Sequence, residues 1–120
     1  MPNFEIETQR EVDVMIVRPG GYINDQGGMR LREECETALA ENLRNIIIDF
    51  HTSEHINSVG IASIIAIIER IDELGGRLIF TGLSATVREV FEIMGITRHV
   101  SVTEDAEAAR SLLTTPDIPS

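Results

Sequence analysis

Residues 45–81 read NIIIDFHTSEHINSVGIASIIAIIERIDELGGRLIFT and contain two short apolar runs separated by a longer periodic segment. The runs at 45–50 and 77–81 are almost continuously apolar, which is typical of strands covered on both faces of a parallel sheet. Parallel strands need a long crossover connection, and an α-helix is the usual one. The stretch therefore predicts a strand–helix–strand unit.

The segment between the two runs has the periodicity of a helix. Its isoleucines recur at three- and four-residue spacing between positions 61 and 71. Isoleucine alone would favour a strand, but the length, the charges beyond Ile68 and the glycine pair at 75–76 favour a helix. We expect it to run from about Ser58 to about Leu74, with Ile64 and Ile68 facing the sheet.

The rest of the chain continues the alternation of strands and helices. Apolar–polar alternation predicts two strands, near 4–8 and 12–16, and breaker residues at 19–21 end the second. A helix is predicted from about Met29 to Asn42, because the glycines at 27 and 28 each cost roughly 1 kcal/mol inside a helix. The remaining predicted elements are a helix capped by Ser84, a strand at 99–102 and a final helix capped by Thr103.

These elements predict an α/β fold, with a single mixed sheet of four to five strands packed with about four α-helices. The length of 120 residues fits one domain. We place this domain at residues 1–113. The tail 114–120 contains two prolines, and we expect it to be disordered.

The charge balance excludes several classes of function. Twenty acidic and ten basic residues give a net charge of −10. Such a surface repels phosphate backbones and anionic lipids, so we expect no nucleic-acid partner and no membrane partner. All ten bases are arginine, which excludes Schiff-base chemistry and a P-loop lysine. The sequence contains no Gly-x-Gly loop either, and we expect no cofactor.

The cysteine content and the apolar runs bear on the cell compartment. Cys35 is the only cysteine, so it forms no internal disulfide and no cysteine-rich zinc site. The acidic N-terminus does not resemble a signal peptide. The longest apolar-rich run, 59–68, is about half of a membrane span. We therefore expect a cytoplasmic protein.

Two groups of residues could form a metal site or a catalytic site, and the sequence support for each is weak. His51 and His55 are four residues apart, but they lie in a predicted loop without a third ligand, so solvated histidines are the simpler interpretation. Ser58, His55 and Asp49 could form a nucleophilic triad. No Gly-x-Ser-x-Gly elbow surrounds the serine, and capping of the following helix explains it more simply. We expect no metal site and no enzymatic activity.

Ser58 still has an unusual setting. On a helical wheel, one sector opposite much of the isoleucine face contains Ser58, Ala62, Ala66, Glu69 and Glu73. A flat, exposed patch of small residues beside a serine suits the docking of a partner protein. An ordinary solvent-facing helix surface would show the same pattern.

The residues from Ile47 to Ile61 resemble the signature of STAS domains, the anti-sigma-factor antagonists of bacteria. That family has an apolar strand ending in Asp, a short loop, then Asp-Ser-Ser/Thr-Gly and an apolar helix. Here the second part reads Ile56-Asn57-Ser58-Val59-Gly60. The resemblance covers residues 4–113 and continues at Gly21-Tyr22-Ile23-Asn24, at Gly75-Gly76-Arg77-Leu78, at Leu83-Ser84 and from Val87 to Gly95-Ile96.

The resemblance implies a binding module controlled by phosphorylation. In relatives, the serine after the motif Asp is phosphorylated by a partner anti-sigma factor that is a serine kinase, and a phosphatase removes the phosphate. The unphosphorylated antagonist captures that partner and so frees a sigma factor. By this resemblance, Ser58 is the residue that accepts the phosphate. We expect the protein itself to be a monomer or a weak dimer. The implied partner-binding residues are Asn24, Asn57, Ser58, Val59, Ala62 and Ala66.

Two positions depart from the family pattern. Asn24 and Asn57 stand where the family has Asp, which keeps an acceptor oxygen and removes the charge. If those carboxylates orient the hydroxyl or the metal of the kinase, phosphorylation of Ser58 is slower or absent, although Asp25 could compensate. The alternative function is therefore a STAS scaffold subunit of a larger stress-signalling or lipid-transport assembly that is not efficiently phosphorylated.

Overall fold

The computed structural model describes residues 5–114, which form a five-stranded sheet, a two-stranded sheet and four α-helices. The large sheet has the order β1-β2-β4-β6-β7, and only the β1–β2 pair is antiparallel. Its strands are β1 (Glu5–Arg10), β2 (Val14–Gly20), β4 (Asn45–Asp49), β6 (Arg77–Thr81) and β7 (Ser101–Thr103). This confirms the predicted α/β fold around a mixed sheet.

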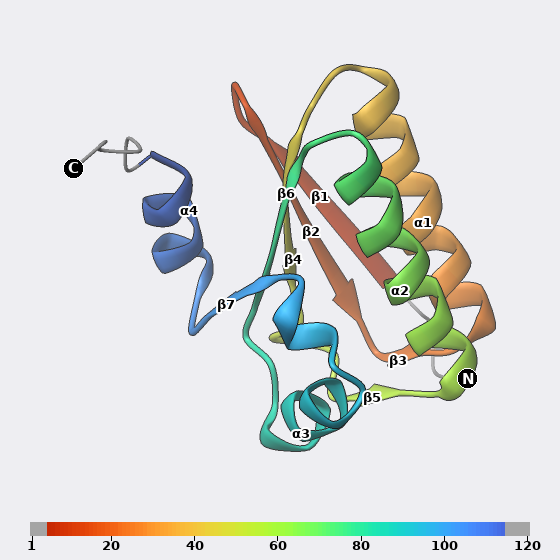
Figure 1. Ribbon diagram of the computed structural model, residues 1–120. Helices are drawn as coiled ribbons and strands as arrows, with labels where there is room; N and C mark the ends of the chain where they lie inside the picture. Colours follow the sequence, from red (N-terminus) through yellow and green to blue (C-terminus); the bar gives the residue numbers. More distant parts are fainter. Residues whose placement is uncertain (1–4, 115–120) are drawn as a thin grey trace.

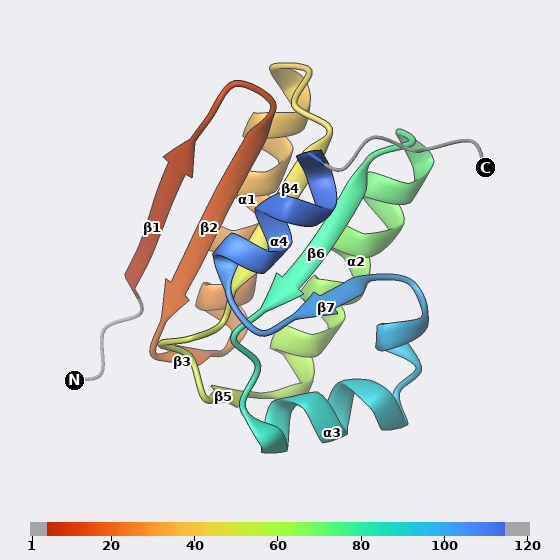
Figure 2. The ribbon, with the colours of Figure 1, turned by 90° about the vertical axis from the view of Figure 1, so that its left-hand side faces the viewer.

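The helices lie on both faces of this sheet (Figures 1 and 2). The long helices α1 (Asp25–Ala40) and α2 (Ser58–Glu73) cover one face, and α4 (Ala106–Thr114) lies on the other. The short helix α3 (Ala85–Ile93) lies beyond the carboxyl ends of the strands and leads through a 3₁₀ turn, Ile96–Arg98, to β7. No helix within residues 5–114 is long and apolar enough to cross a bilayer.

The central strands bury side chains on both faces, which explains their continuous apolar runs. Alternate residues of β4, Ile46 and Ile48, join the larger core under α1 and α2, whereas Ile47 joins a smaller core under α4. Three phenylalanine rings close the larger core near the strand ends, with centroids 5.1 Å apart for Phe50–Phe80 and 5.8 Å for Phe50–Phe91. Such edge contacts add about 0.5–1.5 kcal/mol each to area burial.

The two predicted N-terminal strands are present but lie further along the chain, at 5–10 and 14–20. The prediction that the first helix begins near Met29 was wrong, because α1 begins at Asp25 and contains Gly27 and Gly28. The reason is a close helix–helix contact: a Cβ on Gly28 would lie 2.5 Å from Ser63 Oγ. Glycine, unfavourable by propensity, is required here by packing.

The bounds predicted for the second helix agree with α2 within one residue. Ile64 is buried as expected, and Ile68 packs against the same core but is only half-buried. Ile67 is buried more deeply than Ile68, because α1 covers one flank of α2 and the opposite flank is less covered.

Two details at the C-terminal end also differ from the sequence expectations. The carboxylate of Asp105, and not Thr103, caps α4 by accepting the Ala108 N–H at 2.8 Å. The predicted tail begins at Thr114, which is the last residue of α4, and residues 115–120 lie outside the described residues.

Candidate functional site at the paired helix N-termini

A two-stranded parallel sheet, which the sequence did not reveal, builds the site. Strand β3 (Tyr22–Ile23) precedes α1 and strand β5 (His55–Ile56) precedes α2, and the two strands pair with each other. The Asn57 N–H extends the pairing by donating to the Ile23 carbonyl at 3.1 Å. Because each strand leads directly into a helix, the N-termini of α1 and α2 lie side by side (Figure 1).

Asn24 and Asn57 are the N-caps of these two helices. The Asn24 side chain accepts the Gly27 N–H at 3.1 Å, and the Asn57 side chain accepts the Gly60 N–H at 2.8 Å. The amide group of Asn57 also donates to Asp25 Oδ1 at 3.4 Å. An aspartate at position 57 would instead place two carboxylates next to each other. Asn57 therefore suits a site in which Asp25 supplies the negative charge.

Gly60 allows α2 to approach β3 closely. A Cβ at this position would clash with the Ile23 carbonyl oxygen. Only glycine leaves the space, so the sequence Asn57-Ser58-Val59-Gly60 fixes both the cap and the distance between α2 and β3.

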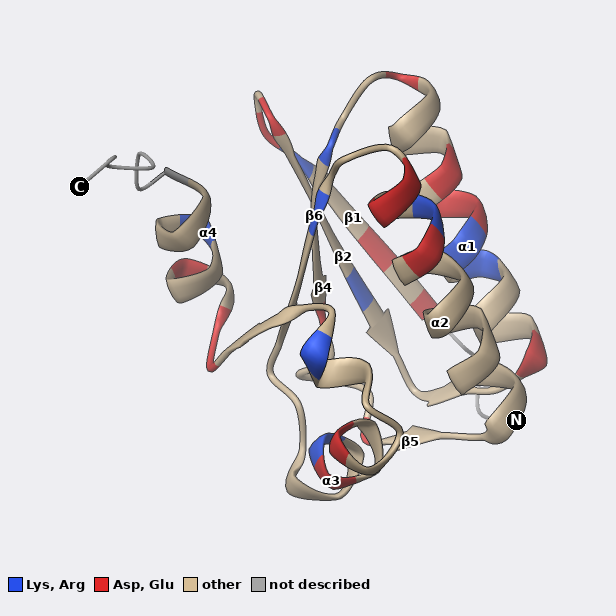
Figure 3. Cartoon of the chain, in the orientation of Figure 1, with Lys and Arg blue, Asp and Glu red and all other residues tan. Residues whose placement is uncertain are grey.

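Ser58 is the first residue of α2 and is exposed. Within residues 5–114 its hydroxyl has no hydrogen-bond partner, and the N–H groups of Ser58 and Val59 are among those that a helix start leaves without an intrahelical acceptor. The Val59 side chain is 47% exposed. No charged residue occurs on α2 before Glu69 (Figure 3), so the charge at the start of this helix comes from the neighbouring Asp25 of α1.

The predicted partner-binding residues lie in two adjoining places. Asn24, Asn57, Ser58 and Val59 surround the paired helix starts. Exposed Ala62 and half-buried Ala66 continue from Ser58 along the outer side of α2. We call Ser58, Ala62 and Ala66 the α2 ridge. Its small side chains leave no bulky group beside the serine hydroxyl, and Ala66 also borders a hollow of about 200 Å³ between α1 and α2.

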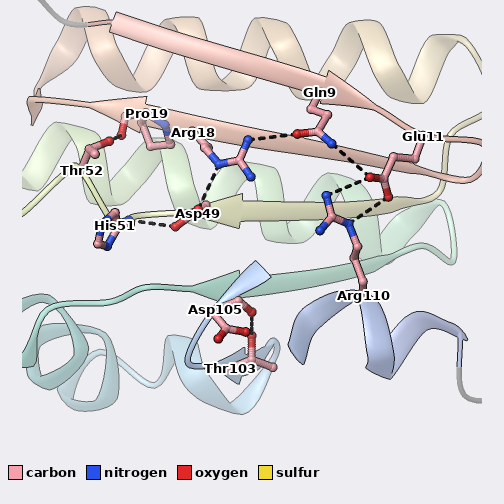
Figure 4. Close-up of polar contacts among 10 residues, drawn as sticks. All are labelled: Gln9, Glu11, Arg18, Pro19, Asp49, His51, Thr52, Thr103, Asp105 and Arg110. Atoms are coloured by element: carbon pink, nitrogen blue, oxygen red, sulfur yellow. Dashed lines mark hydrogen bonds and ion pairs between the residues drawn. The ribbon is translucent and has the colours of Figure 1, made fainter. Parts of the chain in front are cut away.

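The structure does not assemble the hydrolase triad. Both oxygens of Asp49 have other partners, since Oδ2 accepts Arg18 Nε at 3.2 Å and Oδ1 accepts the His51 N–H at 3.0 Å (Figure 4). The His55 ring instead contacts Tyr22 edge-on, at 6.5 Å between centroids. Among the described residues, no group of three or more His, Cys, Asp or Glu is placed to hold a metal ion.

A hollow of about 450 Å³ adjoins the helix starts, between the β3–β5 sheet and α3. Sequence reasoning missed it, because its position depends on the β3–β5 pairing and on where α3 lies. Tyr22 in β3 offered one signal, since it is the only tyrosine and is exposed. The lining residues are Tyr22, Glu54, His55, Ile56, Thr86, Val87 and Val90.

The chain is similar to proteins named for one regulatory function. It is 26% identical over 109 residues to "Putative anti-sigma factor antagonist BtrV" of Bordetella bronchiseptica, covering 90% of this chain and 94% of BtrV. The anti-sigma factor antagonist SpoIIAA in its unphosphorylated form superposes with a TM-score of 0.76 at 19% identity, covering 95% of this chain and 100% of SpoIIAA. The phosphorylated form, from Bacillus, superposes with a TM-score of 0.71 at 21% identity, covering 92% and 99%.

The family itself follows from a match to the STAS domain over residues 3–109. That range contains the whole large sheet, both paired helix starts and the α2 ridge. The chain therefore belongs to the STAS domain family.

Proposed function

We propose that this protein is an anti-sigma-factor antagonist that binds an anti-sigma factor of the serine-kinase type and loses that partner when the kinase phosphorylates Ser58. The observation that carries the proposal is the exposed Ser58 hydroxyl, which has no hydrogen-bond partner within residues 5–114 and lies at the start of a helix whose first turns carry no charged residue. The names of BtrV and SpoIIAA and the existence of a phosphorylated SpoIIAA support it.

In this proposal the partner docks on the α2 ridge, and Asn57 sets the position of the Ser58 hydroxyl. Ala62 and Ala66 allow the partner's backbone to approach closely. The Asn57 cap fixes where α2 starts and therefore where the Ser58 hydroxyl points. The terminal phosphoryl group of ATP passes to Ser58 Oγ, ADP leaves, and a base of the kinase takes the hydroxyl proton.

The phosphate then lies where the fold tolerates it. It meets the free N–H groups of the first turn of α2 and the positive end of the helix dipole. In a docked complex, the same charge of about −1.5 to −2 must be desolvated or must face acids of the partner. Phosphorylation therefore separates the partners without unfolding the antagonist.

The test is intact-mass spectrometry after incubation with ATP and the anti-sigma kinase encoded in the same genome. We expect one phosphoryl group on the wild type and none on Ser58→Ala. Ser111→Ala, which alters an exposed serine on α4, is the matched control and should be phosphorylated like the wild type. Phosphorylation that persists in Ser58→Ala, or its absence from a wild type that binds the kinase, would contradict the proposal.

Gel filtration separates this function from the scaffold alternative. An antagonist should elute as a monomer or weak dimer and form a 1:1 or 1:2 complex with the kinase. Spontaneous assembly into large particles without the kinase would favour the scaffold. Removal of the phosphate from Ser58 by a phosphatase should restore binding to the kinase, which would show that the switch is reversible.

A further inference from the structure

A second surface of α2 carries apolar side chains that the fold leaves partly uncovered. Ile65 and Ile68 on the flank facing α3 are only half-buried. Helix α3 is short and lies beyond the strand ends. The segment that follows α3, with Met94 and Ile96, therefore faces Ile65 and Ile68 of α2. The two walls enclose a groove of about 330 Å³, which we call the α2–α3 groove.

One of the exposed large apolar side chains, Met94, lies in the wall of this groove, and a second, Ile93, lies directly beside it. Met94 in its wall is 51% exposed, and the neighbouring Ile93, which does not line the groove, is 78% exposed. Clustered apolar exposure next to a concave apolar surface marks a binding site more often than scattered exposed residues do. Methionine is also an adaptable contact, because its unbranched side chain fills irregular spaces.

The rim of the groove carries two carboxylates. Glu69 and Asp72 line it together with His99, and neither carboxylate forms an ion pair within residues 5–114. By contrast, Arg70 on the flank facing α1 pairs with Glu36 at 2.9 Å. The whole chain has a net charge of −10. A partner that fits this groove therefore brings cations to the two free carboxylates.

The length of the groove fits the side chains on one face of a helix. From Ile65 to Asp72 the groove follows two turns of α2, about 10 Å at 1.5 Å per residue. That length accepts apolar side chains from two successive turns of a docked helix, at positions i and i+4. No strand lines this groove, so an extended peptide has no exposed strand edge to pair with here.

We propose that the α2–α3 groove binds an amphipathic helix of a partner protein, with apolar residues at i and i+4 and arginine or lysine beside them. This site is additional to the α2 ridge and works independently of Ser58. Ile65 lies seven residues from Ser58, roughly 10 Å along α2, which exceeds the screening length of about 8 Å at physiological salt.

The test uses the full chain and a synthetic 16-residue helical peptide with leucine at i and i+4, flanking arginines and alanine elsewhere. NMR titration should give saturable binding, with the largest shifts at the backbone amides of Ile65, Ile68, Met94 and Ile96. A twin peptide with glutamate in place of each arginine should not bind.

Paired variants locate the binding. Met94→Asp should weaken the peptide about tenfold or more, whereas Ile93→Asp should change its Kd less than about twofold. Asp72→Arg should also weaken it, and Glu89→Arg on the exposed side of α3 should not. All four side chains are exposed, so folding is retained and can be checked by circular dichroism.

Several results would overturn the proposal. These are the absence of saturable binding, shifts centred on another surface, and equal losses in Met94→Asp and Ile93→Asp. A loss in Ser58→Asp as large as in Met94→Asp would contradict the independence from Ser58. No kinase enters the experiment, so its failure leaves the proposed function standing, and failure of the proposed function leaves this result standing.

Discussion

At the scale of single residues, the two asparagines that depart from the family pattern have a structural role. Asn24 and Asn57 cap α1 and α2 through their side-chain oxygens, and Asp25 accepts from the amide of Asn57. Asp25, one residue after Asn24, supplies a carboxylate beside both caps. The sequence placed both asparagines at helix starts or loops, but their proximity depends on the long-range pairing of β3 with β5.

Asn57→Ala should lower the free energy of unfolding by about 1 kcal/mol, because it removes the acceptor for the Gly60 N–H. Urea denaturation measures the change. Asn57→Asp is the control: it keeps the acceptor and suits the helix dipole but faces Asp25, so its stability should stay within about 0.5 kcal/mol of the wild type. An alanine variant as stable as the wild type would show that the cap contributes nothing.

Cys35 gives a prediction about alkaline pH. Burial first, and then the neighbouring Glu34 and Glu36, raise the pKa of its thiol from 9.0 to about 12. The unfolded thiol ionises near its ordinary pKa while the folded thiol stays protonated, so the free energy of unfolding falls as pH rises from about 9 towards 12.

Cys35→Ala lacks this thiol, so its free energy of unfolding should fall less than that of the wild type between about pH 8 and pH 10.5. Other ionising groups are common to both proteins and cancel in the comparison. Urea denaturation at the two pH values provides the measurement. Equal losses in both proteins would mean that the thiol ionises as easily in the folded chain as in the unfolded one.

At the scale of elements, local sequence patterns predicted the long helices and the central strands. They did not predict the pairing of β3 with β5 or the close contact between α1 and α2. The apolar runs of β4 and β6 and the periodicity of α2 follow from burial and are visible in the sequence. The two-residue strands β3 and β5 are too short to have a period. The start of α1 was missed because its contact with α2 outweighs the low helix propensity of Gly27 and Gly28.

Shortening a side chain on the two flanks of α2 should lower the free energy of unfolding by different amounts. Ile64→Ala should cost about 2–5 kcal/mol, because Ile64 is fully buried and its removal leaves a cavity. Ile68→Ala should cost about 1 kcal/mol, because Ile68 is half-buried at the α2–α3 groove and much of its surface is already in water.

Chemical denaturation of both variants, with equal slopes against denaturant, gives these values. The pair is matched, since the same side chain is shortened one turn apart on the same helix. Equal losses would mean that the α3 flank of α2 is as well covered as the sheet-facing side.

At the scale of the whole molecule, the fold keeps the proposed switch apart from the core. The core lies between the sheet and the long helices, whereas Ser58 is at the surface where the two helix starts meet. Most of the acidic charge of α2 lies towards its C-terminal end, and its first turns are uncharged (Figure 3). We therefore expect a negative charge added at Ser58 to change the proposed docking surface strongly and the core hardly at all.

Ser58→Asp imitates this charge and should leave the circular dichroism spectrum unchanged. Its melting temperature should stay equal or rise slightly, since an acid in the first turn of a helix contributes about 0.3–1 kcal/mol. Binding to the anti-sigma kinase should be lost, because each 1.4 kcal/mol of mismatch at the interface weakens affinity about tenfold. Ser111→Asp places the same charge on α4, across the sheet, and should bind normally.

The most direct test of a switch at Ser58 is calorimetric titration of Ser58→Asp with the anti-sigma kinase, beside a thermal melt of the same sample. We expect a melt like that of the wild type and no measurable binding. A variant that binds as tightly as the wild type would contradict an interface switch at Ser58, and a variant that melts far lower would contradict its placement at a helix start that accepts negative charge.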